Sequence, residues 1–382
     1  MSTRIVCPVL CLVFFVSNVG AMIPKDFEVK VGSVVAPLVD TGQPADAFYP
    51  SVGVLIVSGG HAAVYSFGRR EIKAASLVEI GSVSKVFTSL LLAKLASKKI
   101  VDIDSDAEKF LGTSVKIPSF NGQKISLKHL STHSSGLPRI PADLNLASED
   151  QPYADYSAEM LLKFLSDYKL PRPPGSEYEY SNMGAALLGL ALARAINVSF
   201  NDALVEEVLK PLDMSDTAIN LSISQQLRLV QGYRWDGKDT PSWKWDVFAP
   251  TGGLKSTLTD MGKFILAQLN PPEGLTGAAV QLSQAVHFTS KPQKMGLAWH
   301  VIDLDEGETL LWHNGMTYGF SSNLVLAPAS KMGVFVIANA MHLKSNGALD
   351  DRIDQLAFKI FGLLRKENKR VLTKASKSQI KQ

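Results

Sequence analysis

A serine and a lysine three residues apart form the first arrangement in this chain that could do covalent chemistry. The segment Ser82-Val83-Ser84-Lys85 has the pattern Ser-x-x-Lys, and residues three apart lie on one face of a helix. A serine hydroxyl is a poor nucleophile until a base takes its proton, and a lysine held among apolar groups and other cations can have a pKa low enough to help. The helix N-terminus adds backbone N–H groups that face the attacked carbonyl. The spacing therefore predicts nucleophilic catalysis by Ser82.

Two other segments match the same pattern, Ser166 to Lys169 and Ser378 to Lys381. Only Ser82 follows a glycine and precedes a long apolar stretch, residues 86–95. This stretch has no turn residue and is apolar nearly all round, which predicts a helix buried between two layers. We interpret Ser166 as a surface helix residue and Ser378 as part of the C-terminal tail.

A second candidate element is Tyr180-Ser181-Asn182, which follows Pro-Pro-Gly and precedes a helix-like stretch. A phenol near two ammonium groups can lose part of its proton, so Tyr180 could act as a base toward Ser82 and then as an acid toward the leaving group. Asn182 could donate to a substrate carbonyl and bond to Lys85. The alternative is a packed tyrosine beside a helix N-cap.

The third element is His313-Asn314-Gly315, at the end of a predicted strand. Gly315 would let a substrate backbone approach the strand edge, and a partly cationic His313 could bind a carboxylate or keep Tyr180 acidic. Lys331-Met332-Gly333 is a competing Lys-x-Gly site. We prefer His313, because Lys331 has the character of a polar residue opening a buried strand.

The composition is that of an ordinary globular protein, and the length of the chain predicts two lobes. It has 382 residues, 46% of them hydrophobic and 20% charged, which is too large for one simple core. The net charge is only +3, and part of the basic excess lies in the run 365–381. No basic stripe interleaved with aromatics precedes that run, so nucleic-acid binding has little support.

The N-terminus has the pattern of a secretory signal peptide, residues 1–21. Arg4 precedes an apolar run that ends in small residues at Ala21. The run is shorter than the roughly 20 residues of a membrane-spanning helix, so we expect cleavage, a secreted or periplasmic protein, and no stable membrane span. Both cysteines, Cys7 and Cys11, lie in this segment, which leaves the mature chain without a disulfide, a thiol nucleophile or a thiolate metal site.

The order of predicted elements places strands at both ends and helices between them. Residues 51–65 read as a β-hairpin around a Gly-Gly turn. Strands from both ends imply one sheet interrupted by a helical lobe at about 100–250, within a catalytic domain of residues 22–364 and before a basic flexible tail, 365–382. The other expected elements are helices at 158–165, 183–195 and 350–364, and strands at 296–302, 310–313, 322–327 and 333–338.

Taken together, these motifs resemble those of the serine β-lactamase-like family, which includes class C β-lactamases, D,D-carboxypeptidases and related esterases and aminopeptidases. The resemblance covers most of the chain and is strong because the landmarks occur together and in order. Besides the motifs at Ser82 and Tyr180, the landmarks are Leu130 to Pro138, Pro211 to Thr217 and Gly252 to Thr257.

The resemblance implies an α/β fold of the β-lactamase/transpeptidase type, with an antiparallel sheet flanked by helices and an all-α lobe inserted. It places the site in a cleft between the two parts and gives His133 a packing role. It implies an oxyanion hole formed by the backbone N–H groups of Ser82 and Met316, and no metal or cofactor. The candidate residues are thus Ser82, Lys85 and Tyr180 for catalysis, and Asn182, His313, Gly315 and Met316 for binding.

Three functions remain open on the sequence. One is a hydrolase of D-alanyl peptides or β-lactams, another is a carboxylesterase with the same machinery, and the third is a non-catalytic penicillin-binding relative. A binding-only protein has no need of Ser82, Lys85 and Tyr180 together. His313 stands where typical class C β-lactamases carry lysine, which weakens the antibiotic-resistance interpretation. The expected partner is a small-molecule or peptide substrate.

Overall fold

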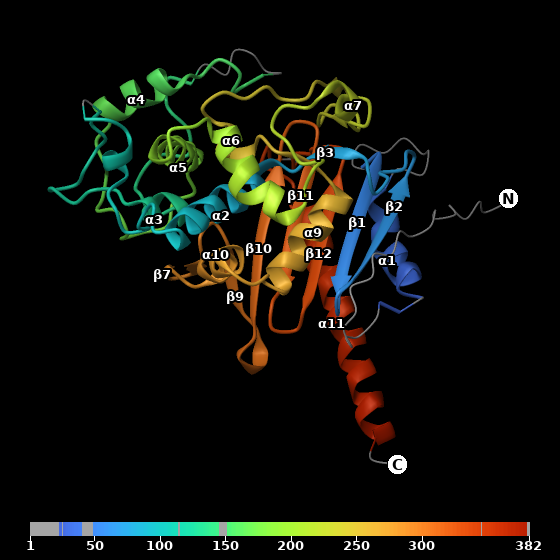
Figure 1. Ribbon diagram of the computed structural model, residues 1–382. Coiled ribbons are helices and arrows are strands. Elements are labelled where there is room, and N and C mark those ends of the chain that lie inside the picture. The colour runs from blue at the N-terminus through green and yellow to red at the C-terminus, as the bar shows by residue number, and fades with distance from the viewer. Residues whose placement is uncertain are drawn as a thin grey trace.

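The central feature of the fold is a fully antiparallel sheet built from both ends of the chain (Figure 1). A computed structural model describes residues 23–24, 26–39, 49–113, 115–144, 151–344 and 346–379. The strand order is β2-β1-β12-β11-β10-β9-β8-β7. The predicted signal peptide, residues 1–21, lies outside the described residues and stays a prediction.

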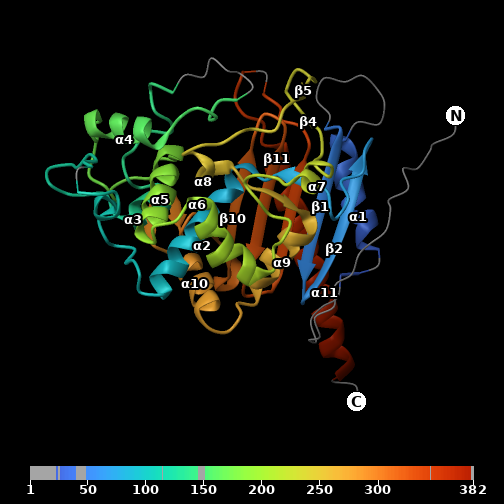
Figure 2. The same ribbon diagram turned by 45° about the horizontal axis from the view of Figure 1, so that its top comes forward.

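Helices cover both faces of the sheet and form a separate lobe at one side (Figures 1 and 2). The strands are β1 (Ser51–Ser58), β2 (His61–Gly68), β3 (Leu77–Glu79), β4 (Gly232–Tyr233), β5 (Asp239–Thr240), β6 (Lys255–Thr257), β7 (Phe288–Ser290), β8 (Gln293–Met295), β9 (His300–Asp303), β10 (Thr309–Met316), β11 (Ser321–Ala327) and β12 (Met332–Ala338). The α-helices are α1 (Phe27–Val35), α2 (Ser84–Ser97), α3 (Leu127–Ser131), α4 (Ala158–Asp167), α5 (Asn182–Ala195), α6 (Phe200–Leu204), α7 (Ile223–Gln226), α8 (Ala249–Gly252), α9 (Leu258–Leu269), α10 (Leu275–Gln284) and α11 (Arg352–Gln379).

The sheet is buried on both faces, and side-chain alternation divides the core in two. Along β12, Val334 and Val336 pack with α1 and α11, whereas Phe335 and Ile337 pack with α2 and α9 on the opposite face. Successive strand residues point to opposite faces, so a strand that is covered on both sides has to be apolar throughout. The predicted α/β architecture, with an antiparallel sheet and an inserted helical lobe, is confirmed.

The basic segment after Leu364, which the sequence predicts to be a flexible tail, forms the end of a helix. Here α11 continues through it to Gln379. The Glu367 carboxylate accepts from Lys30 Nζ at 2.6 Å, and Asn368 Nδ2 donates to Ser58 Oγ at 3.0 Å. These bonds attach the first turns of the segment to α1 and β1, which sequence periodicity does not reveal.

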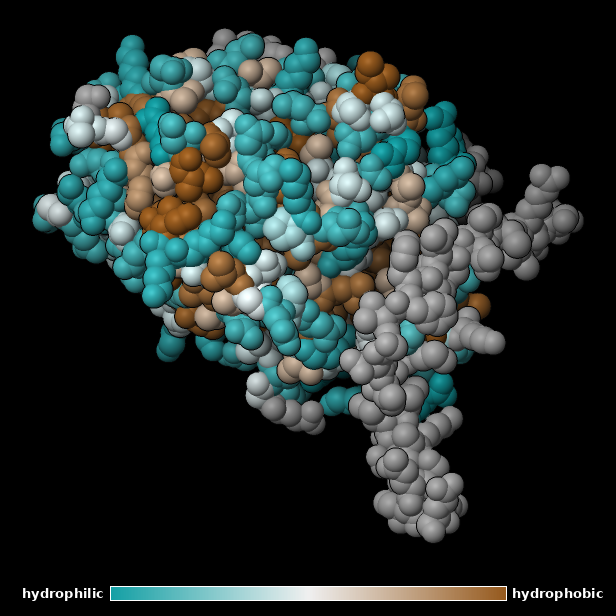
Figure 3. Space-filling model, in the orientation of Figure 1, coloured by the Kyte–Doolittle hydropathy of each residue, from teal (hydrophilic) through white to brown (hydrophobic). Residues whose placement is uncertain are grey.

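Most of the surface in view is mixed in polarity (Figure 3). A small apolar patch lies over α7, where Ile223 and Leu227 are 80% and 85% exposed. Among the described residues, no single helix is long and apolar enough to cross a membrane. One pair of helical segments, Asn182–Ala195 and Phe200–Leu212, reaches that length and apolar composition only when the two are combined, and they are bent by 83° relative to each other.

Candidate active site

The Ser82 and Lys85 side chains meet at the start of α2. Ser82 lies in a single 3-10 turn, η2 (Gly81–Val83), which leads directly into the helix. Lys85 Nζ is 3.1 Å from Ser82 Oγ and donates to the Thr251 carbonyl, on α8, at 2.6 Å. Lys85 is 1% exposed. Burial, together with the positive charge of Arg139, lowers the pKa of Lys85 well below its usual value, which favours the neutral amine that a base requires.

Close approach of η2 to β10 depends on two glycines. Gly81 has φ +52°, and a Cβ there would lie 2.5 Å from Met316 N. A Cβ on Gly315 would lie 2.0 Å from the Ile80 carbonyl oxygen and 2.6 Å from Ser322 Oγ. The space beside Gly315 is therefore filled by the protein's own backbone, rather than kept free for a substrate as we expected. This contact sets the Met316 end of β10 against the Ser82 turn.

Gly315→Ala should destabilise the protein by about 2–4 kcal/mol, because the new methyl group overlaps a backbone carbonyl that cannot move alone. Urea unfolding followed by circular dichroism measures the loss. Gly362→Ala is the matched control, since its Cβ would meet nothing within 4 Å and alanine is the better helix former. A Gly315→Ala protein as stable as Gly362→Ala would contradict the close contact.

Tyr180 joins the pair from the loop before α5. Its hydroxyl lies beside Ser82, and Lys85 Nζ lies 5.0 Å from the centroid of its ring. Ser181 caps α5 by accepting from Gly184 N at 2.8 Å, and its own N–H donates to His133 Nδ1 at 3.2 Å. The His133 ring lies 4.4 Å from the Tyr180 ring, so His133 positions the loop as well as packing beneath it.

The ionisation of Tyr180 differs from the sequence-based expectation. We expected neighbouring cations to make the phenol acidic. Burial instead raises the pKa of Tyr180 to about 12, although the neighbouring Ser82 hydroxyl and the charge of Arg139 act in the opposite direction. Tyr180 therefore holds its proton at neutral pH and is suited to donate it, while Lys85 is the better base.

A hollow of about 510 Å³ opens over Ser82. It brings together the predicted residues Ser82, Tyr180, Asn182, Gly315 and Met316. Sequence reasoning missed the rest of its lining, although Arg139 directly follows the Leu130 to Pro138 landmark. The missed residues include Arg139, Tyr153, Tyr178, Trp243, Trp245, Thr251, His300 and Tyr318.

Aromatic rings form one wall of this hollow. Tyr153 and Trp245 are stacked with centroids 5.1 Å apart and planes 8° apart, and Trp243 meets Tyr318 edge-on at 4.7 Å. Such rings supply a rigid apolar surface at little cost in conformational entropy. The wall is suited to planar or apolar groups of a substrate.

A model of the Beta-lactamase family matches residues 37–358. The chain belongs to this family. The D-alanyl-D-alanine-carboxypeptidase/endopeptidase AmpH of Escherichia coli is 28% identical over 301 residues, covering 75% of this chain and 77% of that protein. An Escherichia coli β-lactamase is 23% identical over 357 residues, covering 83% and 89%.

Two solved structures of the same fold align with this chain over nearly all of their own length. A β-lactamase/D-alanine carboxypeptidase from Yersinia pestis, determined with citrate, aligns with TM-score 0.70 and 23% identity over 87% of this chain and 99% of that one. A class C β-lactamase mutant aligns with TM-score 0.74 and 20% identity, covering 88% and 97%. The predicted resemblance to the serine β-lactamase family is confirmed, and membership supports serine hydrolase chemistry.

Within this β-lactamase-family site, Asn182 makes no hydrogen bond to Lys85, although we expected one. Its Nδ2 donates to the Tyr153 hydroxyl at 3.4 Å. Its Oδ1 is buried and accepts no hydrogen bond from the described residues. Because an unpaired buried acceptor is costly, this oxygen is suited to accept from a substrate N–H group.

His313 is fully buried beside Tyr180, with ring centroids 6.3 Å apart. Its Nδ1 lies 2.6 Å from the Asn314 carbonyl, so Nδ1 carries the proton and Nε2 is unprotonated. Burial, aided by His300 and Lys85, lowers the pKa of His313 well below its usual value. A neutral imidazole replaces the partly cationic one expected from the sequence. The competing Lys331 instead donates to the Leu269 carbonyl, away from the hollow.

His300 makes the stability of the folded protein sensitive to acid. Burial lowers its pKa to about 4, and it stacks on Trp312 at 4.4 Å. An unfolded chain would take up the proton near pH 6.5, so the contribution of His300 to stability is complete above pH 6.5 and is lost as the pH falls toward 4.

His300→Gln should reduce the pH dependence of the unfolding free energy by about 1.4 kcal/mol per pH unit between pH 6.5 and 4. Urea unfolding at pH 7, 6 and 5 measures the unfolding free energy of wild type and His300→Gln. The same change with pH in both proteins would refute the prediction.

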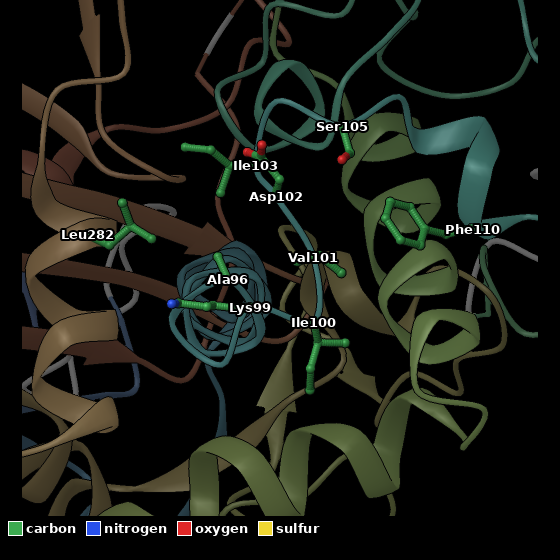
Figure 4. Close-up of a pocket in the computed structure, with 9 residues that line it drawn as sticks. All are labelled: Ala96, Lys99, Ile100, Val101, Asp102, Ile103, Ser105, Phe110 and Leu282. Atoms are coloured by element: carbon green, nitrogen blue, oxygen red, sulfur yellow. The ribbon is translucent and has the colours of Figure 1, made fainter.

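A second hollow, of about 470 Å³, lies at the other end of α2 (Figure 4). Most of its walls are apolar, and its polar side chains are Lys99, Asp102 and Ser105. They offer no serine–lysine pair at hydrogen-bonding distance. The hollow over Ser82 is therefore the candidate active site. Among the described residues, no cluster of His, Cys, Asp and Glu could hold a metal ion.

Proposed function

We propose that this chain is a serine hydrolase that forms an acyl-enzyme on Ser82 and hydrolyses D-alanyl peptides or β-lactam amide bonds. The 3.1 Å contact between Lys85 Nζ and Ser82 Oγ carries the proposal. It supplies a nucleophile and a base with a lowered pKa at the floor of an open hollow. Activation of serine by a neighbouring base is the general requirement for this chemistry.

The proposed acylation uses each side chain in the protonation state that its surroundings favour. Neutral Lys85 takes the Ser82 proton while Oγ bonds to the carbonyl carbon, and the backbone N–H groups of Ser82 and Met316 bind the resulting oxyanion. Tyr180 donates its proton to the leaving nitrogen as the C–N bond breaks, and Lys85 returns a proton to Tyr180. Water then attacks the ester, and its proton passes to Ser82 as the acyl group leaves.

The relatives support an amide substrate. AmpH is named a carboxypeptidase and endopeptidase for D-alanyl-D-alanine, and another relative is named a β-lactamase. A carboxylesterase is the second candidate, because the neutral His313 offers no ammonium in the third motif. The two activities share the same machinery and differ in the substrate that acylates Ser82 productively.

Intact-mass analysis tests the proposal. The protein is exposed in parallel to a penicillin, to a peptide ending in D-alanyl-D-alanine and to a neutral nitrophenyl ester. A penicillin adduct that decays, together with release of D-alanine, supports amide hydrolysis. Turnover of the ester alone favours the esterase. An unmodified protein with no turnover of any of the three would refute a serine hydrolase.

A further inference from the structure

The proposed substrates raise a problem of charge that the three motifs do not solve. A D-alanyl peptide and a penicillin both carry a carboxylate close to the bond that is cleaved. His313 is buried and neutral, and Lys85 has to be neutral to act as a base. The motifs therefore provide no cation for this carboxylate.

Arg139 brings a cation to the hollow from outside the motifs. It lies in the loop after α3 and, among the described lining residues, is the sole lysine or arginine. Its guanidinium carbon is 4.8 Å from the Tyr180 ring centroid. Tyr180 itself lies beside Ser82 in the lining of the hollow. A carboxylate bound by Arg139 would thus lie next to the reacting groups.

Within the described part of the chain, the guanidinium of Arg139 has its donors free for a ligand. It is exposed, and no side-chain hydrogen bond or ion pair joins it to any described residue. Other arginines are engaged: Arg228 pairs with Asp216, and Arg172 with Glu179. A planar guanidinium with unused N–H groups matches a carboxylate in two parallel bonds, and stacking on a ring fixes its plane.

The acidic residues of the hollow already have partners of their own. Asp350 pairs with Arg352, and Asp351 lies 3.0 Å from Lys344. Asp354 accepts from Asn314 Nδ2 and Asn323 Nδ2, both at 2.8 Å. None of these described carboxylates pairs with Arg139, so its positive charge is available to an anionic substrate.

We propose that Arg139 is the specificity residue that binds the substrate carboxylate, in the role for which the third-motif histidine is unsuited. The inference rests on the proposed function at Ser82. It predicts a preference for acyl substrates that carry a free carboxylate beside the scissile bond. Because a guanidinium stays charged, the preference should not change between pH 6 and 9.

The charge of Arg139 has a second effect, which the test has to separate from binding. It also lowers the pKa of Lys85 and Tyr180, so its removal changes the activation of Ser82 for every substrate. A neutral ester reports this common effect. The ratio of kcat/KM for a penicillin to kcat/KM for the neutral ester isolates the carboxylate contact.

The experiment measures this ratio from pH 6 to 9 in wild type, Arg139→Gln, Arg139→Lys and His313→Gln. We expect Arg139→Gln to lower the ratio about tenfold, Arg139→Lys to lower it less, and His313→Gln to leave it unchanged. Arg70→Gln is the matched control, because it removes the same charge from an exposed residue outside the hollow. Its ratio should equal that of wild type.

Two results would overturn the proposal: an unchanged ratio in Arg139→Gln, as an equal loss on both substrates would give, or a ratio that falls only in His313→Gln. If wild type hydrolyses neither substrate, the proposed function fails separately. Calorimetric binding of N-acetyl-D-alanine and its amide then tests Arg139 alone. Wild type should prefer the carboxylate and Arg139→Gln should not, whereas equal preference in both would refute the contact.

Discussion

Ser82→Ala should lower kcat for the best substrate by at least about a thousandfold and leave the protein unlabelled after exposure to penicillin. The expected loss is large because, in the proposed mechanism, Ser82 Oγ is the atom that bonds to the acyl group and no other group takes over that bond. Steady-state kinetics and peptide mapping of the wild-type adduct measure the two effects. Removal of Oγ should leave the fold intact, because Ser82 is only half-buried.

Ser166→Ala is the matched control for this change. Ser166 has the same Ser-x-x-Lys pattern, but it lies exposed on α4 and donates to the Lys163 carbonyl at 2.7 Å. We expect its kinetics to equal those of wild type. A label on Ser166, or full activity in Ser82→Ala, would show that the nucleophile is assigned wrongly.

Lys85→Met should reduce kcat by about a thousandfold or more. Methionine fills nearly the same buried volume, but it cannot accept the Ser82 proton. In wild type, kcat/KM should fall with decreasing pH as Lys85 becomes protonated, and this acidic limb should be absent in the mutant. Adding Ser82→Ala to Lys85→Met should cost little more, because groups that act as a unit are not additive.

Lys94→Met on the same helix controls for the loss of a buried lysine. Lys94 is 8% exposed and donates to Thr276 Oγ1 at 2.6 Å, and it does not line the hollow over Ser82. Its kcat should match that of wild type. An unchanged pH profile in Lys85→Met, with only a uniform loss also seen in Lys94→Met, would argue for a structural role of Lys85.

Much of the fold could be predicted from short stretches of the sequence. The Gly59-Gly60 turn predicted the hairpin of β1 and β2, and both glycines have positive φ as such a turn requires. The apolar stretch 86–95 lies within α2, and the predicted strand 333–338 lies within β12. The short strands β7 and β8, at one end of the sheet, were not predicted, because three residues carry too little periodicity to indicate a strand.

Sequence by itself determined that Ser82 and Lys85 meet, since helix geometry places residues three apart on one face. The sequence also contains, in the expected order, the landmark segments that indicate the family. Only the tertiary structure decided the protonation states of Tyr180 and His313, and it brought Arg139 to the hollow. The physical reason is that a pKa depends on the water and charge around a group. Those surroundings come from elements far apart in the chain, which local spacing does not encode.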